Sequence, residues 1–145
     1  MALITEYDAF AAAHAAGQNQ IVYTRLAAAL DTPVSLMLKL TGAQEDAFVL
    51  ESVTGGEVRG RYSIIGMKPD LVWRCRGETS AINRTARYDA DAFVDVPGNP
   101  LDVLRDLIAE SRIDLPLDLP QAAAGLFGFL GYDMVRLVEH LPDVN

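Results

Sequence analysis

The sequence predicts an α+β fold, in which a largely antiparallel β-sheet has helices packed against it. Three observations lead to this fold class. Helical segments with recognisable caps occur near both ends of the chain, short β segments in its middle are separated by closely spaced turns, and no linker or internal repeat divides the sequence. We therefore expect one continuous unit from residue 1 to residue 145.

The composition is that of a folded globular protein. The chain has 145 residues, of which 50% are hydrophobic and 22% are charged. The formal net charge is -8, and because phosphate backbones attract clustered Lys and Arg, nucleic acid is not expected as a partner. The sequence has no secretory leader and no apolar run that could span a membrane, so we expect neither export nor insertion. The single cysteine, Cys75, fits a reducing cytoplasm.

The first two helices are predicted mainly from their ends. An alanine-rich segment from about Glu6 to Ala16 predicts the first helix, and residues 21–24, which are β-branched or aromatic, predict a short strand after it. Thr32 can cap a second helix, which begins at Pro33 and stops before Gly42. Its predicted apolar stripe consists of Pro33, Leu36, Met37 and Leu40.

The middle of the chain, from Ala47 to Cys75, is predicted to be β structure. The segments are 47–53, 62–66 and 71–76. Turns at Gly55–Gly56 and Pro69–Asp70 separate them, and turns at this spacing predict an antiparallel meander. Residues 79–87 are a candidate for a further, polar edge strand.

The last third of the chain predicts a helix, a strand and another helix. Asn99 caps a helix whose buried stripe is predicted to be Leu101, Leu104 and Ile108. Residues 123–131 are apolar on both alternating faces, as expected of a central strand, and residues 132–142 predict a final helix with Met134, Val138 and Leu141 facing inward. A central strand with no partner after it suggests that part of the sheet lies beyond Asn145.

The sequence contains no cluster of residue types that is typical of a catalytic or metal site. Gly55, Gly56 and Gly60 lack the residues of a phosphate loop and are interpreted as hairpin turns. His14 and His140 have no partner at a metal-ligand spacing. The β segments also carry Arg59, Arg61, Arg74 and Arg76, which are interpreted as a solvated face or cross-strand pairs, with a dedicated anion site as the alternative.

A carboxylate and a hydroxyl, Glu51 and Ser52, interrupt the apolar segment just before the glycine turn. Successive side chains of a strand face opposite sides, so Ser52 shares a face with Leu50, and Glu51 lies on the other face. One interpretation is that the strand leaves the core here and both groups are solvated. The other is a small-ligand site, in which a carboxylate and a hydroxyl recognise an ammonium and a carboxylate group.

Three segments resemble a known enzyme family. They are "TPVSLMLKL", "FVLESVTGGEVRGRYSIIGMKPDLVWR" and "GLFGFLGYDMVRLVEHLP". In this order they are similar to the amino-terminal region of anthranilate synthase component I, a chorismate-utilising enzyme of tryptophan biosynthesis. The resemblance extends from Thr32 to Pro142 and implies that the chain is an incomplete portion of a larger two-domain α/β-sandwich enzyme.

The resemblance also implies a regulatory site. In this family the Leu-Glu-Ser segment lines the allosteric pocket for L-tryptophan, so Leu50, Glu51 and Ser52 are expected to contact this inhibitor, and Tyr62 on the nearby strand is a further candidate. Residues 1–145 would then be the amino-terminal regulatory region. The family's active site, with chorismate and Mg²⁺, belongs to a carboxyl-terminal catalytic domain that this chain does not contain, so no catalytic residue, metal ligand or cofactor is assigned here.

The implied parent enzyme converts chorismate and ammonia to anthranilate and pyruvate, with ammonia delivered from glutamine by an amidotransferase subunit, component II. The portion seen here would supply feedback control and would not be catalytic alone. Two alternatives remain: the amino-terminal region of aminodeoxychorismate synthase component I, which serves folate biosynthesis, and a stand-alone amino-acid-binding domain. Self-association through exposed apolar surface is also open.

Overall fold

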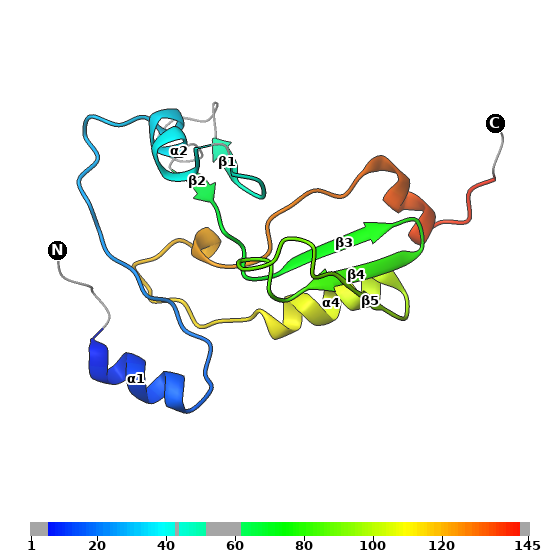
Figure 1. Ribbon diagram of the computed structural model, residues 1–145, viewed down its shortest axis with the longest axis horizontal. Helices are drawn as coiled ribbons and strands as arrows, with labels where there is room; N and C mark the ends of the chain where they lie inside the picture. Colours follow the sequence, from blue (N-terminus) through cyan, green and yellow to red (C-terminus); the bar gives the residue numbers. More distant parts are fainter. Residues whose placement is uncertain (1–5, 43, 52–61, 143–145) are drawn as a thin grey trace. The chain divides into compact units, whose positions relative to one another are not determined.

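The computed structural model describes residues 6–42, 44–51 and 62–142 (Figure 1). Their α helices and antiparallel strands confirm the predicted α+β class. The chain forms two compact units. Unit 1 comprises Met1–Leu26, Arg74–Ala81 and Asp95–Asn145, and unit 2 comprises Ala27–Trp73 and Ile82–Val94.

In unit 1, helix α1 is confirmed and the strand predicted after it is not formed. Helix α1 spans Tyr7–Ala15, and it ends where Gly17 adopts a positive φ of 67°. Residues 21–24 have no strand assignment, so that prediction was wrong. β-Branched side chains favour extended backbone, but a strand also needs a neighbouring ladder. Instead, the phenol of Tyr23 donates to both carboxylate oxygens of Asp118 at 3.0 Å, and Arg25 forms an ion pair with Asp118 at 2.8 Å.

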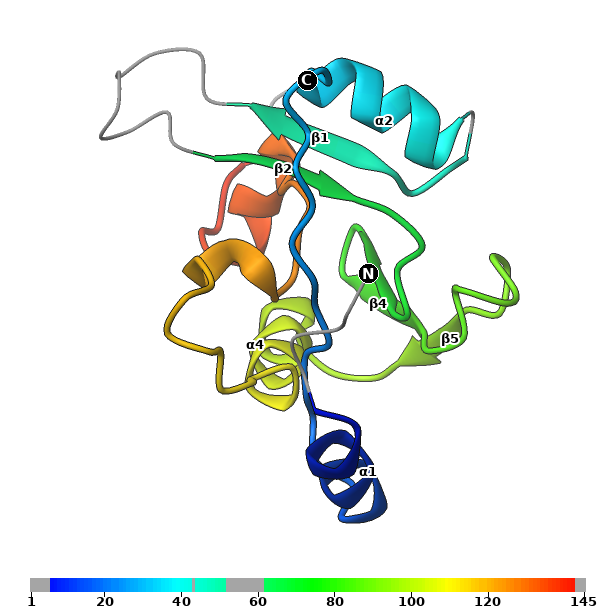
Figure 2. The same cartoon turned by 90° about the vertical axis from the view of Figure 1, so that its left-hand side faces the viewer.

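In unit 2, helix α2 (Pro33–Thr41) contacts a two-stranded antiparallel sheet (Figure 2). Strand β1 is Phe48–Glu51, and strand β2 is Ser63–Gly66. Both strands and the helix were predicted, and the Thr32 cap is confirmed. The predicted turn at Gly55–Gly56 lies outside the described residues.

The predicted meander is divided between two sheets. Strands β3 (Val72–Arg76), β4 (Thr79–Asn83) and β5 (Val94–Val96) form a separate three-stranded sheet in the order β3-β4-β5. The continuous meander was therefore wrong at the Pro69 turn. Lys68 has a φ of 51° and Pro69 has no N–H to donate, so the backbone turns there and the ladder of β2 does not continue into β3.

Strand β4 is confirmed, but its predicted place at an edge was wrong. It is the central strand of its sheet, and Ser80, Ile82 and Asn83 are buried. Strand β4 is central because β5 pairs with its other side. Strand β5 was not predicted, because a segment of three residues is too short to show an alternating pattern.

Helix α4 (Pro100–Glu110) begins where it was predicted, and one of the three residues predicted to be buried, Ile108, was wrong. The side chain of Asn99 accepts a hydrogen bond of 2.8 Å from the N–H of Leu101. Leu107 is buried, whereas Ile108 is 49% exposed. Leu101, Val103 and Leu104 are half-buried, so two of the three predicted stripe residues, Leu101 and Leu104, are confirmed. Because each residue turns the helix by about 100°, Ile108 points away from the side on which Leu107 is buried.

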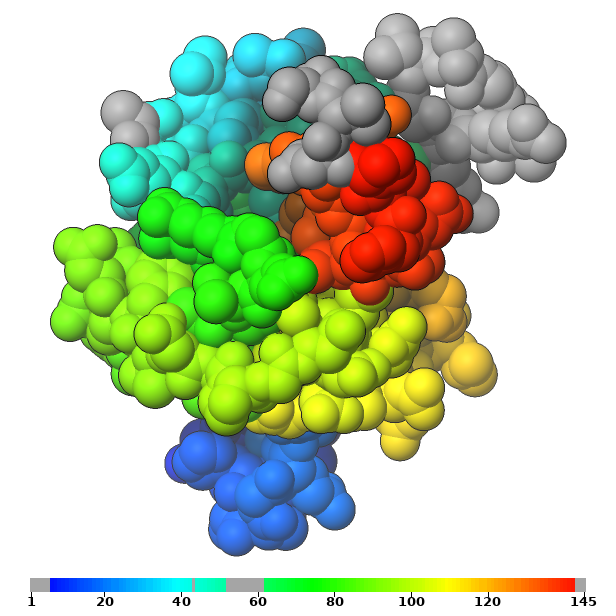
Figure 3. Space-filling model, turned by 90° about the vertical axis from the view of Figure 1, so that its right-hand side faces the viewer, coloured from blue at the N-terminus to red at the C-terminus, as the bar shows by residue number. Residues whose placement is uncertain are grey.

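The predicted central strand at residues 123–131 is absent from the described structure. A 3-10 turn, η1, spans Gln121–Ala123, and no regular element follows until η2, a second 3-10 turn at Tyr132–Leu137 that replaces the predicted α helix. Phe129 is 92% exposed, and Figure 3 shows the segment that carries η2, in orange and red, at the surface. A strand that is apolar on both faces needs neighbours to cover it, and none of the described strands pairs with this segment.

Candidate functional site

The end of the β1–β2 hairpin brings together three of the four predicted site residues. The antiparallel register places Glu51 opposite Ser63 and Leu50 opposite Ile64. Tyr62 directly precedes Ser63, so it lies at the same end of the hairpin as Glu51. The fourth residue, Ser52, lies outside the described residues.

The three side chains at this end differ in chemistry and are accessible. Leu50 and Tyr62 are each 51% exposed, and Glu51 is exposed as well. Strand alternation directs Leu50 and Glu51 to opposite faces of the sheet. An exposed carboxylate can bind an ammonium group, and an aliphatic and an aromatic side chain can contact an apolar ring. This combination suits an amphipathic amino acid better than a phosphate or a nucleotide.

Helix α2, which contacts both strands, is fixed at its N-terminus by a capping box. The N–H of Ser35 donates to Oγ1 of Thr32 at 3.1 Å, and the N–H of Thr32 donates to Oγ of Ser35 at 2.9 Å. Each bond satisfies a backbone donor that would otherwise lack a partner at a helix start. A sheet of only two strands is marginally stable by itself. Among the other described helices and strands, α2 makes most of the contacts with β1 and β2, and it therefore stabilises them.

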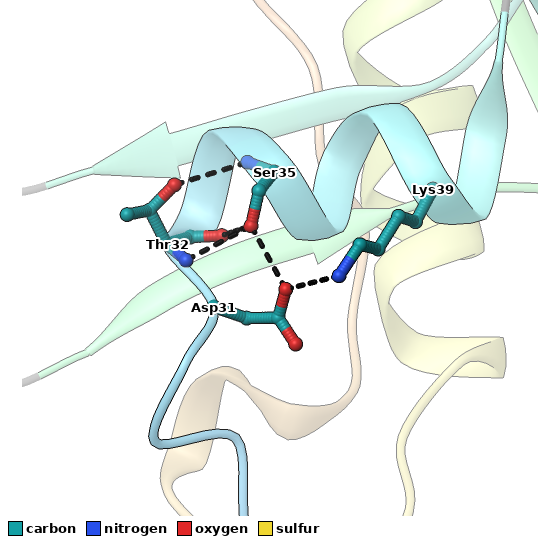
Figure 4. A network of polar contacts seen from close by, with 4 residues as sticks. All are labelled: Asp31, Thr32, Ser35 and Lys39. Atoms are coloured by element: carbon teal, nitrogen blue, oxygen red, sulfur yellow. Dashed lines mark hydrogen bonds and ion pairs between the residues drawn. The ribbon is translucent and has the colours of Figure 1, made fainter.

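A further carboxylate, Asp31, joins the capping box to the last turn of α2 (Figure 4). Its Oδ1 accepts a 3.0 Å hydrogen bond from Oγ of Ser35 and pairs with Nζ of Lys39. The hydrogen bond from Lys39, and then that from Ser35, lower the pKa of Asp31 below its ordinary value of 3.8. The network was not predicted, although the spacing of Asp31, Ser35 and Lys39, four residues apart, places them on one side of a helical turn.

Two depressions in unit 1 contain none of the predicted site residues. One, of about 270 Å³, lies at the start of α4 and is lined by Glu78, Gly98, Asn99, Pro100, Arg136 and Leu137. The other, of about 520 Å³, follows the end of α4 and includes Ile108, Arg112, Asp114 and Leu126. In the first, the Asn99 side chain is already bonded to the helix N-terminus, and the second is lined by a mixture of polar and apolar residues.

The cysteine and a histidine have local structural contacts. The ring of His14 stacks on that of Phe10 with 5.9 Å between centroids. The thiol of Cys75 donates to the carbonyl of Gly77 at 3.4 Å, and desolvation raises the pKa of this thiol, which reduces its thiolate fraction.

Within residues 6–42, 44–51 and 62–142, no group of three or more His, Cys, Asp or Glu side chains could hold a metal ion. None of the helices in those ranges is both long and apolar enough to cross a membrane.

Comparison with curated proteins gives matches over nearly the whole chain. The chain is 66% identical over 142 residues to "Anthranilate synthase component 1" of Cereibacter sphaeroides, an alignment that covers 98% of this chain and 28% of that protein. It is 41% identical over 120 residues to the protein of the same name in Synechocystis, covering 81% of this chain and 22% of the relative. A third relative with this name, from Acinetobacter calcoaceticus, is 35% identical over 141 residues, or 94% of this chain and 27% of the relative.

The chain therefore spans about a quarter of the length of the curated relatives it matches. No protein-family model and no solved structure matches it.

Proposed function

This chain is a homologue of the amino-terminal region of anthranilate synthase component 1, and on that premise we propose that it carries the L-tryptophan feedback-inhibition site of such an enzyme. The observation that carries the proposal is the accessible end of the β1–β2 hairpin, where Leu50, Glu51 and Tyr62 all lie exposed. Ser52, adjacent to Glu51 in sequence, completes the proposed set.

The proposed contacts follow from the chemistry of tryptophan. Glu51 binds the ammonium group of the ligand, and the Ser52 hydroxyl donates a hydrogen bond to its carboxylate. Leu50 and Tyr62 contact the indole, whose apolar faces and edge suit an aliphatic and an aromatic neighbour. Ser52 directly follows Glu51 in the sequence, so the two polar groups of the proposed site come from adjacent residues.

The complete enzyme that we propose converts chorismate and ammonia to anthranilate and pyruvate in the cytoplasm. Its catalytic domain, which binds chorismate and Mg²⁺, lies outside this chain, and an amidotransferase subunit, component II, supplies ammonia from glutamine. The relatives described above share the anthranilate synthase name, which favours this reaction over that of aminodeoxychorismate synthase. The present chain is regulatory and is not catalytic by itself.

Regulation by this site requires two arrangements of the enzyme with different affinities for tryptophan. Tryptophan at the hairpin end favours the arrangement that binds chorismate weakly. By linkage, chorismate weakens tryptophan binding by the same factor, which corresponds to a coupling free energy of about 1 to 3 kcal/mol in typical allosteric proteins.

Substitution of Ser52 tests the proposal directly. In the full-length protein, Ser52→Phe places a ring where the ligand carboxylate is proposed to bind and removes its hydrogen-bond donor. We expect the tryptophan concentration for half-inhibition to rise by about tenfold or more, which corresponds to the loss of about 1.4 kcal/mol of binding free energy. The measurement is anthranilate fluorescence in a tryptophan titration, with kcat and KM for chorismate determined in parallel.

A control variant, Ser111→Phe, makes the same chemical change at the end of α4, a segment to which no ligand contact is assigned. This control should retain the inhibition of the unchanged protein. Equal inhibition of Ser52→Phe and the unchanged protein would contradict the tryptophan-site proposal, and a complete protein that forms no anthranilate would contradict the proposed reaction.

A further inference from the structure

A phenylalanine ring occupies the space that a side chain on Gly66 would need. Phe48 is the first residue of β1, and Gly66, the last residue of β2, is directly opposite. A β-carbon added to Gly66 would lie 2.9 Å from Cδ1 of Phe48 and closer still to Cε1 and Cζ. The φ of Gly66 is not positive, so the preference for glycine here arises from the ring and not from the backbone conformation.

This pair shares a face of the sheet with the proposed ligand contact Leu50. In an antiparallel ladder, residues directly opposite each other point to the same side, and residues two apart on one strand do so as well. The Phe48–Gly66 pair and the Leu50–Ile64 pair are therefore consecutive pairs on one face. The ring of Phe48 is half-buried, whereas Leu50 is 51% exposed.

In so small a sheet, side-chain contacts are needed to fix the register of the two strands. Each strand has four residues, and the described sheet contains only β1 and β2, so few ladder hydrogen bonds oppose a slip. A slip of one residue would exchange the faces of Leu50 and Glu51. With the ring of Phe48 in this position, glycine fits opposite it, whereas a residue with a β-carbon, such as the neighbouring Ile65, would force the ring to move, so the register that pairs Phe48 with Gly66 is favoured.

We propose that the Phe48–Gly66 pair is a positioning device for the tryptophan site: it sets the register of β1 on β2 and so determines which faces Leu50 and Glu51 present to the ligand. This inference rests on the proposed function. Neither residue touches the ligand. They act through the strand that carries the ligand contacts, and they leave the chemical step unchanged because that step takes place in another domain.

A double-mutant cycle tests the pair in the full-length protein. The variants are Gly66→Ala, Phe48→Leu and their combination, and the control is Gly128→Ala, where an added β-carbon has no neighbour within 4 Å. Gly66→Ala should raise the tryptophan concentration for half-inhibition by about fivefold or more, the lower end of typical allosteric couplings, with kcat and KM for chorismate unchanged. Phe48→Leu removes the outer ring atoms, so Gly66→Ala should add nothing further in that background.

Amide hydrogen exchange of β1 and β2 in the same variants provides a second readout. Protection should fall in Gly66→Ala and should not fall further when this change is added to Phe48→Leu. Gly128→Ala should match the unchanged protein in both measurements.

The outcomes separate the two proposals. If the unchanged protein is inhibited and Gly66→Ala is inhibited equally, the positioning role is wrong and the proposed function stands. If Gly66→Ala has the same effect with Leu as with Phe at position 48, or lowers kcat in parallel, the effect is general destabilisation and the positioning role is also wrong. If tryptophan does not inhibit the unchanged protein, the proposed function fails, and the positioning role fails with it.

Discussion

Asn83 is a completely buried polar residue that organises the loop after β4. Its Nδ2 donates to the carbonyl of Asp89 at 2.6 Å, and its Oδ1 accepts from the N–H of Thr85 at 2.9 Å. Both ends of the side-chain amide therefore satisfy backbone groups of the loop. Sequence periodicity did not identify this role, because an asparagine at the end of a strand also suits an ordinary solvent-exposed turn.

Replacement of Asn83 should be costly. Asn83→Ala leaves a backbone donor and a backbone acceptor without their partner, and we expect the free energy of unfolding to fall by about 1 to 3 kcal/mol. Urea denaturation of this chain measures the change. Asn19→Ala is the matched control, because the amide of Asn19 donates to the carbonyl of Glu110 at an exposed site, and its loss should cost less than about 0.5 kcal/mol. Equal losses in the two variants would contradict a structural role for the buried amide.

At the scale of elements, helix α2 illustrates what local sequence can specify. Thr32, Pro33 and Gly42 predicted where the helix begins and ends, and the structure confirms both limits. The helix is further stabilised by the ionised Asp31, which pairs with Lys39 and accepts from Ser35. These partners lower the pKa of Asp31 in the folded state. The stabilisation of the folded chain by ionised Asp31 is therefore fully present above pH 3.8, the ordinary pKa, and it is lost as the pH falls through the lower pKa of the folded state.

Asp31→Asn should therefore destabilise the chain in a pH-dependent way. Asn retains an acceptor for Ser35 but loses the charge that pairs with Lys39. We expect a lower thermal midpoint than the unchanged chain at neutral pH, and a difference that shrinks as the pH falls below 3.8. Thermal unfolding followed by circular dichroism at several pH values gives the comparison.

Thr32→Ala provides the control for this prediction, because a hydroxyl cap does not titrate. Its loss should cost about 1 kcal/mol at every pH in the series. If the deficit of Asp31→Asn were as constant as that of Thr32→Ala, the ionised pair would not be the source of the stabilisation.

At the scale of the whole molecule, unit 1 exposes apolar residues in a segment that the predicted fold placed in a covered central strand. In the segment that was expected to form a central strand, Phe129 is 92% exposed and Leu130 is 60% exposed, and Tyr132 just after it is 94% exposed. Contiguous apolar surface of this kind favours association, either with other polypeptide or with a second copy of the chain.

We expect this chain to self-associate through that segment. Phe129→Asp should lower the average mass at high protein concentration, because it places a charge within the apolar surface. Tyr88→Asp is the matched control: Tyr88 is 87% exposed on the loop between β4 and β5, outside the apolar segment. Sedimentation equilibrium measures the masses, and an equal effect of both substitutions would assign any change to net charge alone.

In the candidate site, too, some features follow from neighbouring residues in the sequence and others only from strand pairing. That Leu50 and Glu51 face opposite sides followed from strand alternation, which is a property of consecutive residues. That Tyr62 lies at the same end of the hairpin depended on the antiparallel pairing of Glu51 with Ser63, which periodicity does not specify. The Asp31 network and the Phe48–Gly66 pair were found only in the structure, because each depends on the distances between side chains.

The sequence alone determined the limits of α1, α2 and the start of α4, and the positions of β1 to β4. Helices and their caps form hydrogen bonds between residues at most a few positions apart, so local composition specifies them. The tertiary structure decided which strands pair, that β4 is central, that Leu107 and not Ile108 is buried, and that residues 21–24 and 123–131 form no strand. Strand pairing and burial require a partner that is distant in sequence, and a segment with high β propensity becomes a strand only where such a partner lies beside it.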